Sequence, residues 1–258
     1  MAGILLIFIC GVQVWPMWTG DVFPDYYRVK VPDYYQQANL LINEDRSDGR
    51  ILSLPMVRDE GVRYDWGYIG IEPSEFLFDK STISKTLFSK YNDVGYRQIY
   101  NALSIEGGYD NFLDQSNVKY LLLHNDMDTE FSLASPSAEI KAVLKKNPKI
   151  SLLGHVGELT IYRYDGTNNS QLIVAEGSNP PQLSYKKVSS REYLARVEGA
   201  DSPFKIILKN VYNPNWKASI GGEKVNSHLV ALGYANGWEI DRKGDYTINI
   251  RFKVWPWE

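Results

Sequence analysis

Alternation of apolar and polar residues over the last part of the chain is the feature that most restricts its fold. From Leu183 onward, segments such as "EYLARVEG" and "DYTINIRFKV" repeat with a period of two and are separated by turn residues. This period is that of a β-strand with one buried face. Six or seven such strands in about 75 residues are typical of an antiparallel sandwich or barrel. We therefore predict an all-β sandwich for residues 183–258.

The preceding part of the chain alternates short apolar runs with helix-like segments, which is typical of an α/β region with a small mixed sheet. The strands are predicted at Arg50–Val57, at Val118–His124 and in two pieces of Ile150–Asp165, and the helices at Pro32–Asn43, at 83–91, at 96–103 and after an N-cap at Ser135. The predicted fold class is therefore α+β.

Two polar, glycine- and proline-containing stretches, "DGTNNSQ" and "EGSNPPQ", are the strongest linker signals in the chain. They predict an α/β domain at residues 21–165, a linker at 166–182 and the sandwich domain after it.

The first residues differ from the rest, because Ala2–Val12 is apolar or small throughout and Trp15 and Trp18 follow it. Tryptophan at the polar end of an apolar run is typical of a membrane interface, although a spanning helix needs about twenty apolar residues. We interpret residues 1–20 as the outer end of a transmembrane helix whose beginning is missing or short. A signal sequence and a buried soluble helix are the alternatives. The first basic residue is Arg28, and no A-x-A pattern precedes Asp21, which disfavours a signal sequence.

Composition and motifs exclude several classes of function. The formal charge of −3 and the lack of any run of five like charges disfavour a nucleic-acid partner. Cys10 is the only cysteine, so neither an internal disulfide nor a cysteine-based zinc site is expected. Phosphate-binding loops, a nucleophile elbow and metalloprotease signatures are absent from the sequence. We therefore predict no cofactor and no metal, and the separated His124, His155 and His228 are interpreted as strand-end or surface residues.

Two stretches near the C-terminus resemble a known pattern: "PPQLSYKKVSSREYLARVEGADSPFKIILKNVYNPNWKASIGGEKV" and "HLVALGYANGWEIDRKGDYTINIRF". They are similar to the C-terminal extracytoplasmic region of large polytopic membrane proteins, the YfhO-type and arabinofuranosyltransferase-like relatives of the GT-C glycosyltransferases. The matching positions are Tyr193, Phe204, Tyr212, Pro214, Trp216, Lys217, Ala218 and Gly233–Trp238. The similarity extends from about Pro32 onward and is most specific in the last eighty residues or so.

This resemblance implies a function for the whole chain. GT-C enzymes carry their catalytic carboxylate in an early loop between transmembrane helices that this chain lacks. The chain would then be a non-catalytic C-terminal piece, membrane-bound with its bulk on the extracytoplasmic side, and relatives would continue after "KVWPWE" into a last membrane helix. It would support the catalytic membrane domain or bind a glycan acceptor during assembly of cell-surface polysaccharide or glycoprotein. The full-length parent would use a lipid-linked sugar. The alternative is a stand-alone, membrane-anchored carbohydrate-binding or adhesion protein.

The loop "RDEGVRYDWGYIG" is the richest source of candidate glycan-binding side chains. Carboxylates and Arg bind sugar hydroxyls, and Trp and Tyr stack on the apolar face of a sugar ring. The candidates are Arg58, Glu60, Asp65, Trp66 and Tyr68. The alternative is a loop whose charges pair with one another and whose aromatic rings cover the sheet. A third hypothesis, a soluble hydrolase, would use Glu60 and Asp65 as its paired carboxylates.

Trp216 and Trp238 complete the glycan-binding candidates. Strand alternation places Trp216 on the same face as Ala218 and Ile220, and Trp238 on the same face as Ile240. We therefore predict that both indoles pack in the core, with a glycan platform at the rim of the sandwich as the alternative.

The acidic stretch "NDMDTE" has its carboxylates at alternate positions, as at the start of a calcium-binding loop. It lacks the glycine and the distal glutamate of such a loop, so we interpret it as an acidic turn after a strand.

Overall fold

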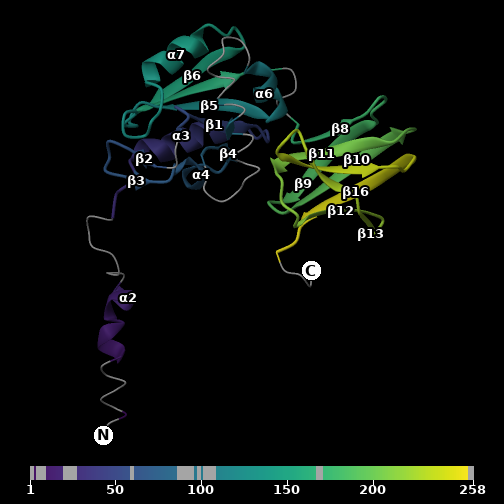
Figure 1. Cartoon of the computed structure of the whole chain (residues 1–258), viewed down its shortest axis with the longest axis horizontal. Coiled ribbons are helices and arrows are strands. Elements are labelled where there is room, and N and C mark those ends of the chain that lie inside the picture. Colours follow the sequence, from purple (N-terminus) through teal and green to yellow (C-terminus); the bar gives the residue numbers. More distant parts are fainter. Residues whose placement is uncertain are drawn as a thin grey trace.

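The computed structural model describes residues 3, 10–19, 28–58, 61–85, 96–97, 100, 109–166 and 171–254 of the 258-residue chain. Figure 1 shows a body built around a mixed sheet, a second body of antiparallel sheets beside it, and the short helix α2 (Trp15–Thr19) apart from both. Within the described parts of the chain, no helix has both the length and the apolar character that a membrane crossing requires. The transmembrane segment at residues 1–20 therefore stays a prediction.

The first body has a five-stranded mixed sheet in the order β4-β1-β5-β7-β6. Its strands are β1 (Arg50–Leu54), β4 (Thr82–Ile83), β5 (Val118–His124), β6 (Ile150–Val156) and β7 (Leu159–Tyr164). Strand β1 pairs in parallel with β4 and β5, whereas β7 pairs antiparallel with β5 and β6. This arrangement confirms the predicted mixed sheet, and every residue of β1 is buried because both faces of the sheet are covered.

Helices and a small hairpin complete the first body. Helix α3 contacts β6 and β7, and the aromatic and aliphatic side chains of its buried face join the core beneath it. The helices are α3 (Asp33–Asn43), α4 (Ser74–Leu77), α6 (Asp110–Gln115) and α7 (Ser137–Lys145), and the hairpin joins β2 (Val62–Arg63) to β3 (Ile69–Gly70).

Two details of the predicted helices are wrong. The N-cap of α7 is Pro136 rather than Ser135, because Pro136 still has an extended backbone (φ −54°, ψ 137°), and no side chain caps the helix. The hydroxyl of Ser137 instead donates to the His124 carbonyl. Of the tract predicted as helical at 83–91, Ile83 belongs to β4. Residues 86–91 and most of the tract 96–103 lie outside the described residues.

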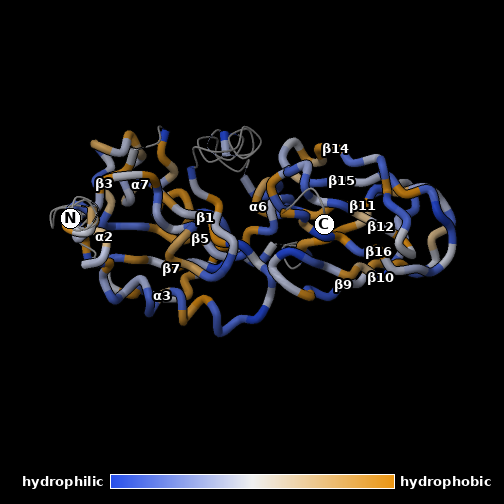
Figure 2. Tube along the Cα trace, turned by 90° about the horizontal axis from the view of Figure 1, so that it is seen from below, coloured by the Kyte–Doolittle hydropathy of each residue, from blue (hydrophilic) through white to orange (hydrophobic). Residues whose placement is uncertain are grey.

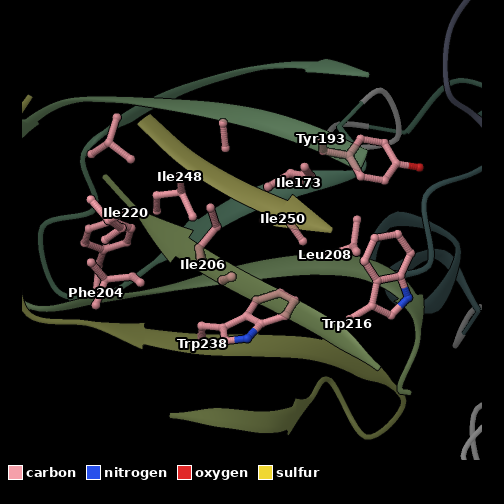
Figure 3. Packing of buried hydrophobic residues seen from close by; sticks show 14 of the residues in the cluster. Ile173, Tyr193, Phe204, Ile206, Leu208, Trp216, Ile220, Trp238, Ile248 and Ile250 are labelled. Atoms are coloured by element: carbon pink, nitrogen blue, oxygen red, sulfur yellow. The ribbon is translucent and has the colours of Figure 1, made fainter. Parts of the chain in front are cut away.

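The second body consists of two antiparallel sheets, β13-β12-β16-β10-β9 and β14-β15-β11-β8. A single hydrophobic cluster contains residues from both sheets, and Trp216 and Trp238 lie in it (Figure 3). The strands are β8 (Ile173–Glu176), β9 (Gln182–Ser189), β10 (Glu192–Ala200), β11 (Phe204–Val211), β12 (Trp216–Ile220), β13 (Glu223–Val225), β14 (His228–Ala231), β15 (Ala235–Ile240) and β16 (Gly244–Phe252).

The strands of this body differ from the prediction in two ways. Asn226 and Ser227 separate β13 from β14, and these two strands belong to different sheets. Eight strands, β9 to β16, therefore replace the predicted six or seven. Strand β8 lies inside the predicted linker and pairs with β11, because that partner satisfies its backbone groups.

Buried polar contacts join the two bodies. Nη1 of Arg50 donates to the carbonyl of Lys209 at 3.2 Å, and Nζ of Lys209 donates to the carbonyl of Asp114 at 3.2 Å. The hydroxyl of Tyr234 donates to the carbonyl of Gln115 at 3.1 Å. Arg50 and Lys209 are each only 4% exposed. Figure 2 shows the bodies side by side from a second direction.

Candidate functional site

The β2–β3 hairpin covers one edge of the mixed sheet. Strands β1 and β5 are parallel, so their carboxyl ends meet at this edge. The backbone N–H of Asp65 donates to the carbonyl of Asp126 at 2.8 Å, and the N–H of Asp128 donates to the carbonyl of Arg63 at 2.9 Å. The hairpin and the turn after β5 are therefore held together at the site where the parallel strands end.

The hairpin carries a cluster of aromatic rings on its inner side. The ring centroid of Trp66 lies 5.5 Å from that of Tyr64 and 5.2 Å from that of Tyr68, both in stacked orientation. Tyr35, from α3, meets Trp66 edge-on at 5.8 Å. Tyr64 is buried, Trp66 and Tyr68 are half-buried, and Asp65 between them is exposed. These rings form an aromatic surface with a carboxylate at its margin.

A buried polar cluster lies beneath the rings, centred on His124 at the end of β5. Its Nε2 is 3.1 Å from the hydroxyl oxygen of Ser53 and 3.1 Å from that of Ser74. Its Nδ1 is 3.2 Å from the hydroxyl of Tyr35 and 3.6 Å from Oδ1 of Asp126. The His124 side chain is fully buried, so these contacts replace the water that it loses.

Two buried carboxylates flank the histidine. Tyr34 and Tyr35 donate to Oδ2 of Asp126 at 2.6 and 3.0 Å. Burial raises the pKa of Asp126, but contacts with His124 and the two tyrosine hydroxyls outweigh that effect and hold the pKa below its usual range.

The second carboxylate, Glu72, accepts from the hydroxyl of Tyr64 at 3.0 Å and from that of Ser74 at 2.6 Å. Burial, followed by the nearby charge of Glu72, raises the pKa of Tyr64 well above its usual value. Because Tyr64 belongs to the hairpin, this bond ties the hairpin to the cluster.

The order serine, histidine, aspartate resembles the arrangement used in nucleophilic catalysis, but the direction of the hydrogen bonds differs. The Ser74 hydroxyl donates its hydrogen bond to Glu72, so His124 Nε2 must donate to Ser74 rather than accept from it. A general base would need a lone pair at that nitrogen. In this arrangement the cluster anchors the hairpin and the start of α3 to the sheet edge.

The structure brings together three of the predicted glycan-binding residues, namely Asp65, Trp66 and Tyr68. Arg58 is exposed at the same sheet edge, where its backbone N–H donates to the carbonyl of Leu133 at 3.4 Å. Glu60 lies outside the described residues. The hydrolase hypothesis depends on the distance between the carboxyl groups of Glu60 and Asp65, and it therefore stays a prediction.

Trp216 and Trp238 lie in the second body and are 6% and 0% exposed. The alternation predicted for β12 is confirmed, because Ala218 and Ile220 are buried with Trp216 while Lys217 is not. Trp238 stacks on His228 with centroids 4.7 Å apart and an interplanar angle of 6°. Both indoles pack in the core, as the alternation predicted.

The sequence analysis missed His124, Glu72 and Asp126 as members of one cluster. His124 was predicted as a strand-end or surface residue; it is a strand-end residue, but it is buried. A polar residue that ends a largely apolar strand was the available signal, because sites gather at the carboxyl ends of parallel strands. No local pattern pointed to Glu72.

The acidic stretch after β5 is a turn, as predicted, and its carboxylates point in different directions. Asp126 is buried against His124, whereas Asp128 forms an ion pair with Arg63. In the part of the chain that the structure describes, no three His, Cys, Asp or Glu side chains are grouped so that they could hold a metal ion.

The depressed pKa of Asp126 predicts a pH dependence of stability. A carboxyl whose pKa is lower in the folded chain stabilises it above the unfolded value of about 4, and this stabilisation is lost as the pH falls toward the folded pKa. We expect the free energy of unfolding to fall less steeply below about pH 5 in Asp126→Asn than in the unaltered chain, as measured by denaturant titration at each pH. The difference between the two pH profiles separates the contribution of Asp126 from that of Asp45, whose pKa is also lowered. Equal pH profiles would contradict this assignment.

Comparison with known proteins shows the family of the chain. A family model described as "Alpha-(1->3)-arabinofuranosyltransferase, N-terminal GT-C domain" matches residues 1–186. The chain belongs to this family. The resemblance inferred from the sequence is thereby confirmed, although the match covers the first 186 residues and the quoted motifs lie mostly after them. No curated protein sequence matches the chain.

Two solved structures of the arabinofuranosyltransferase AftD from mycobacteria, obtained by single-particle cryo-electron microscopy, are similar to the chain. The first has a TM-score of 0.47 at 11% identity and covers 97% of this chain and 32% of that one. The second, of a mutant, has a TM-score of 0.47 at 10% identity and covers 97% and 33%. The chain thus spans about a third of the length of these proteins.

Proposed function

We propose that the chain is a non-catalytic, extracytoplasmic region of a membrane-bound GT-C-like glycosyltransferase and that it binds a glycan acceptor at the β2–β3 hairpin. Membership of the arabinofuranosyltransferase family supports the enzyme class. The observation that carries the binding site is the half-buried pair Trp66 and Tyr68 beside the exposed Asp65. Sugar-binding sites commonly combine an aromatic ring, which packs on the C–H face of the sugar, with a carboxylate that accepts from hydroxyls.

The rigidity of the hairpin supports a binding role. Backbone bonds join it to the turn after β5, and the Tyr64 hydroxyl bonds to the buried Glu72. A binding surface that is already ordered loses less conformational entropy when its ligand binds. The buried cluster would thus contribute to affinity without touching the glycan.

A non-catalytic role fits the same cluster. The hydroxyl proton of Ser74 bonds to Glu72, and His124 is shielded from solvent by the rings above it. We further propose that the two antiparallel sheets form one β-sandwich module whose tryptophans serve packing. The domain division at residues 165 and 183 is part of this proposal, with β8 as a strand contributed by the connecting segment.

Replacing Trp66 by alanine tests the proposed site. We expect the unaltered full chain, in detergent micelles, to bind on an array of arabinofuranosyl, galactofuranosyl and pyranosyl oligosaccharides. Trp66→Ala should weaken that binding about tenfold or more, which corresponds to a loss of roughly 1.4 kcal/mol of contact energy. Asp65→Asn should weaken it less, and without loss of stability, because that side chain is exposed.

The matched control is Phe76→Ala, which removes an exposed aromatic ring from α4. It should leave binding unchanged, and thermal melting of each variant separates loss of binding from loss of folding. Equal binding by Trp66→Ala and the unaltered chain, or no binding to any oligosaccharide, would contradict the proposed site.

A further inference from the structure

We infer that the outer side of the β2–β3 hairpin and the turn after β5 rest on the surface of a lipid bilayer through an apolar rim formed by Ile69, Phe131 and Leu133. This inference rests on the proposed membrane-bound location, and it assigns the part of the folded body that faces the lipid. The rim lies on the opposite side of the hairpin from the Trp66 ring cluster.

Strand alternation places the rim on the outside. Tyr64 points inward, where its ring lies 5.4 Å from that of His124, and the Tyr68 ring lies 6.3 Å from that of Tyr64. Arg63 and Ile69 are the neighbouring pair, so their side chains point outward. The guanidinium of Arg63 lies 4.6 Å from the ring centroid of Phe131, which makes Ile69, Arg63 and Phe131 one continuous surface.

The three apolar side chains of the rim are strongly exposed to solvent. Ile69 is 64% exposed, Phe131 44% and Leu133 53%. Isolated exposed apolar residues are ordinary, but a contiguous group on one side of a small structural element marks a contact with another apolar phase. Phe131 and Leu133 belong to the same turn, and the Arg58 N–H bonds to the Leu133 carbonyl, so the backbone of this turn is held at the sheet edge beside the hairpin.

The path of the chain identifies that phase as lipid. Before α2 the chain carries the apolar run Ala2–Val12, and the exposed Trp15 and Trp18 lie at its polar end, as they would at a membrane interface. The chain then meets the folded body at the hairpin, since a Cβ placed on Gly67 would lie 3.6 Å from Cγ1 of Val29.

The length of the connection keeps the hairpin close to that interface. Eight residues separate Thr19 from Arg28, and an extended chain covers at most about 3.5 Å per residue, so the two lie within roughly 30 Å of each other. In both Figure 1 and Figure 2, α2 lies at the β2–β3 end of the first body. The end of the body nearest the membrane segment is therefore the end that carries the apolar rim.

One basic side chain next to the rim suits a bilayer surface. Arg58 is exposed, and its backbone N–H bonds to the carbonyl of the rim residue Leu133. A long cationic side chain can lay its apolar stem along a membrane surface and reach the lipid phosphates with its charged end.

The test attaches fluorescent labels to single cysteines, which is simple because the chain has only one cysteine to replace. In a Cys10→Ser background, single cysteines are placed at the rim as Ile69→Cys or Phe131→Cys. Matched controls of similar exposure are Leu152→Cys in β6 (54%) and Val188→Cys in β9 (50%). Each full-length variant carries a polarity-sensitive fluorophore and is reconstituted into phosphatidylcholine–phosphatidylglycerol vesicles that contain a lipid quencher near the headgroup.

We expect the rim labels to be quenched at least about threefold more than the control labels, because a docked rim enters the headgroup region. Equal quenching at rim and control positions in chains that float with the vesicles would overturn the inference and leave the membrane anchor intact. Chains that do not float would contradict the proposed membrane location itself. Rim labels that are shielded from aqueous iodide but not quenched by lipid would mean that another protein segment covers the rim, which also overturns the inference.

Discussion

The variant Trp238→Ala is expected to lower the free energy of unfolding by about 3–5 kcal/mol, because truncating a fully buried indole leaves a cavity that the surrounding strands cannot fill. Trp238 is 0% exposed, and its strand β15 lies between β14 and β11. The indole also stacks on His228, which would lose that contact. Denaturant titration of the full chain in detergent, followed by far-UV circular dichroism, measures the change.

Two further variants show whether the effect comes from the cavity. Phe76→Ala removes a ring that is 73% exposed and should change the free energy by less than about 0.5 kcal/mol. Trp238→Phe should cost less than the alanine variant, because it keeps a ring and removes Nε1, which is buried without a partner among the described residues. A loss below about 1 kcal/mol for Trp238→Ala would contradict the core assignment.

The second large effect is expected for His124→Ala, at about 3–5 kcal/mol, because it leaves the carboxylates of Asp126 and Glu72 buried without their shared partner. These two groups are 1% and 4% exposed, so water cannot replace the lost contacts without opening the site. We also expect faster amide hydrogen exchange across residues 61–70, since the hairpin bonds to both the turn at Asp126 and to Glu72.

The matched control is His155→Ala, which removes an exposed histidine whose ring bonds to Thr160 at 3.1 Å. Its free energy of unfolding should fall by about 1 kcal/mol or less, and exchange in the hairpin should stay unchanged. Comparable losses for the two histidine variants would contradict a central role for His124. A large loss without faster exchange at residues 61–70 would contradict the anchoring of the hairpin.

Local sequence patterns were sufficient to predict the bounds and the buried face of those helices and strands whose limits depend on their own residues. The strand predicted at Val118–His124 has those bounds in the structure, and helix α3 follows the predicted Pro32 and ends at Asn43 as expected. Alternation also predicted the buried face of β12, including Trp216. In each case the period of the hydrophobic residues reports which face is buried, and that information is contained in a few consecutive residues.

Only part of the candidate site could be found in this way. Asp65, Trp66 and Tyr68 were predicted together because they share one loop of unusual composition. Whether their loop is a hairpin, and which side of it faces inward, depends on the pairing of Arg63 with Ile69 and on contacts with the turn after β5. The apolar rim has the same origin, since Phe131 joins it through Arg63.

The sequence by itself determined the α/β character of the first body, the strand-rich second body and the family resemblance, because these depend on periodicity and on motifs read along the chain. The tertiary structure alone decided the polar cluster, which joins Tyr35, Glu72, His124 and Asp126 from three separate segments. It also decided the place of β8, which the sequence predicts as part of a linker but which forms a strand because β11 supplies its hydrogen-bond partners. Contacts between distant segments arise from the burial of shared faces, and no local pattern specifies which distant residue will meet a buried histidine or complete the edge of a sheet.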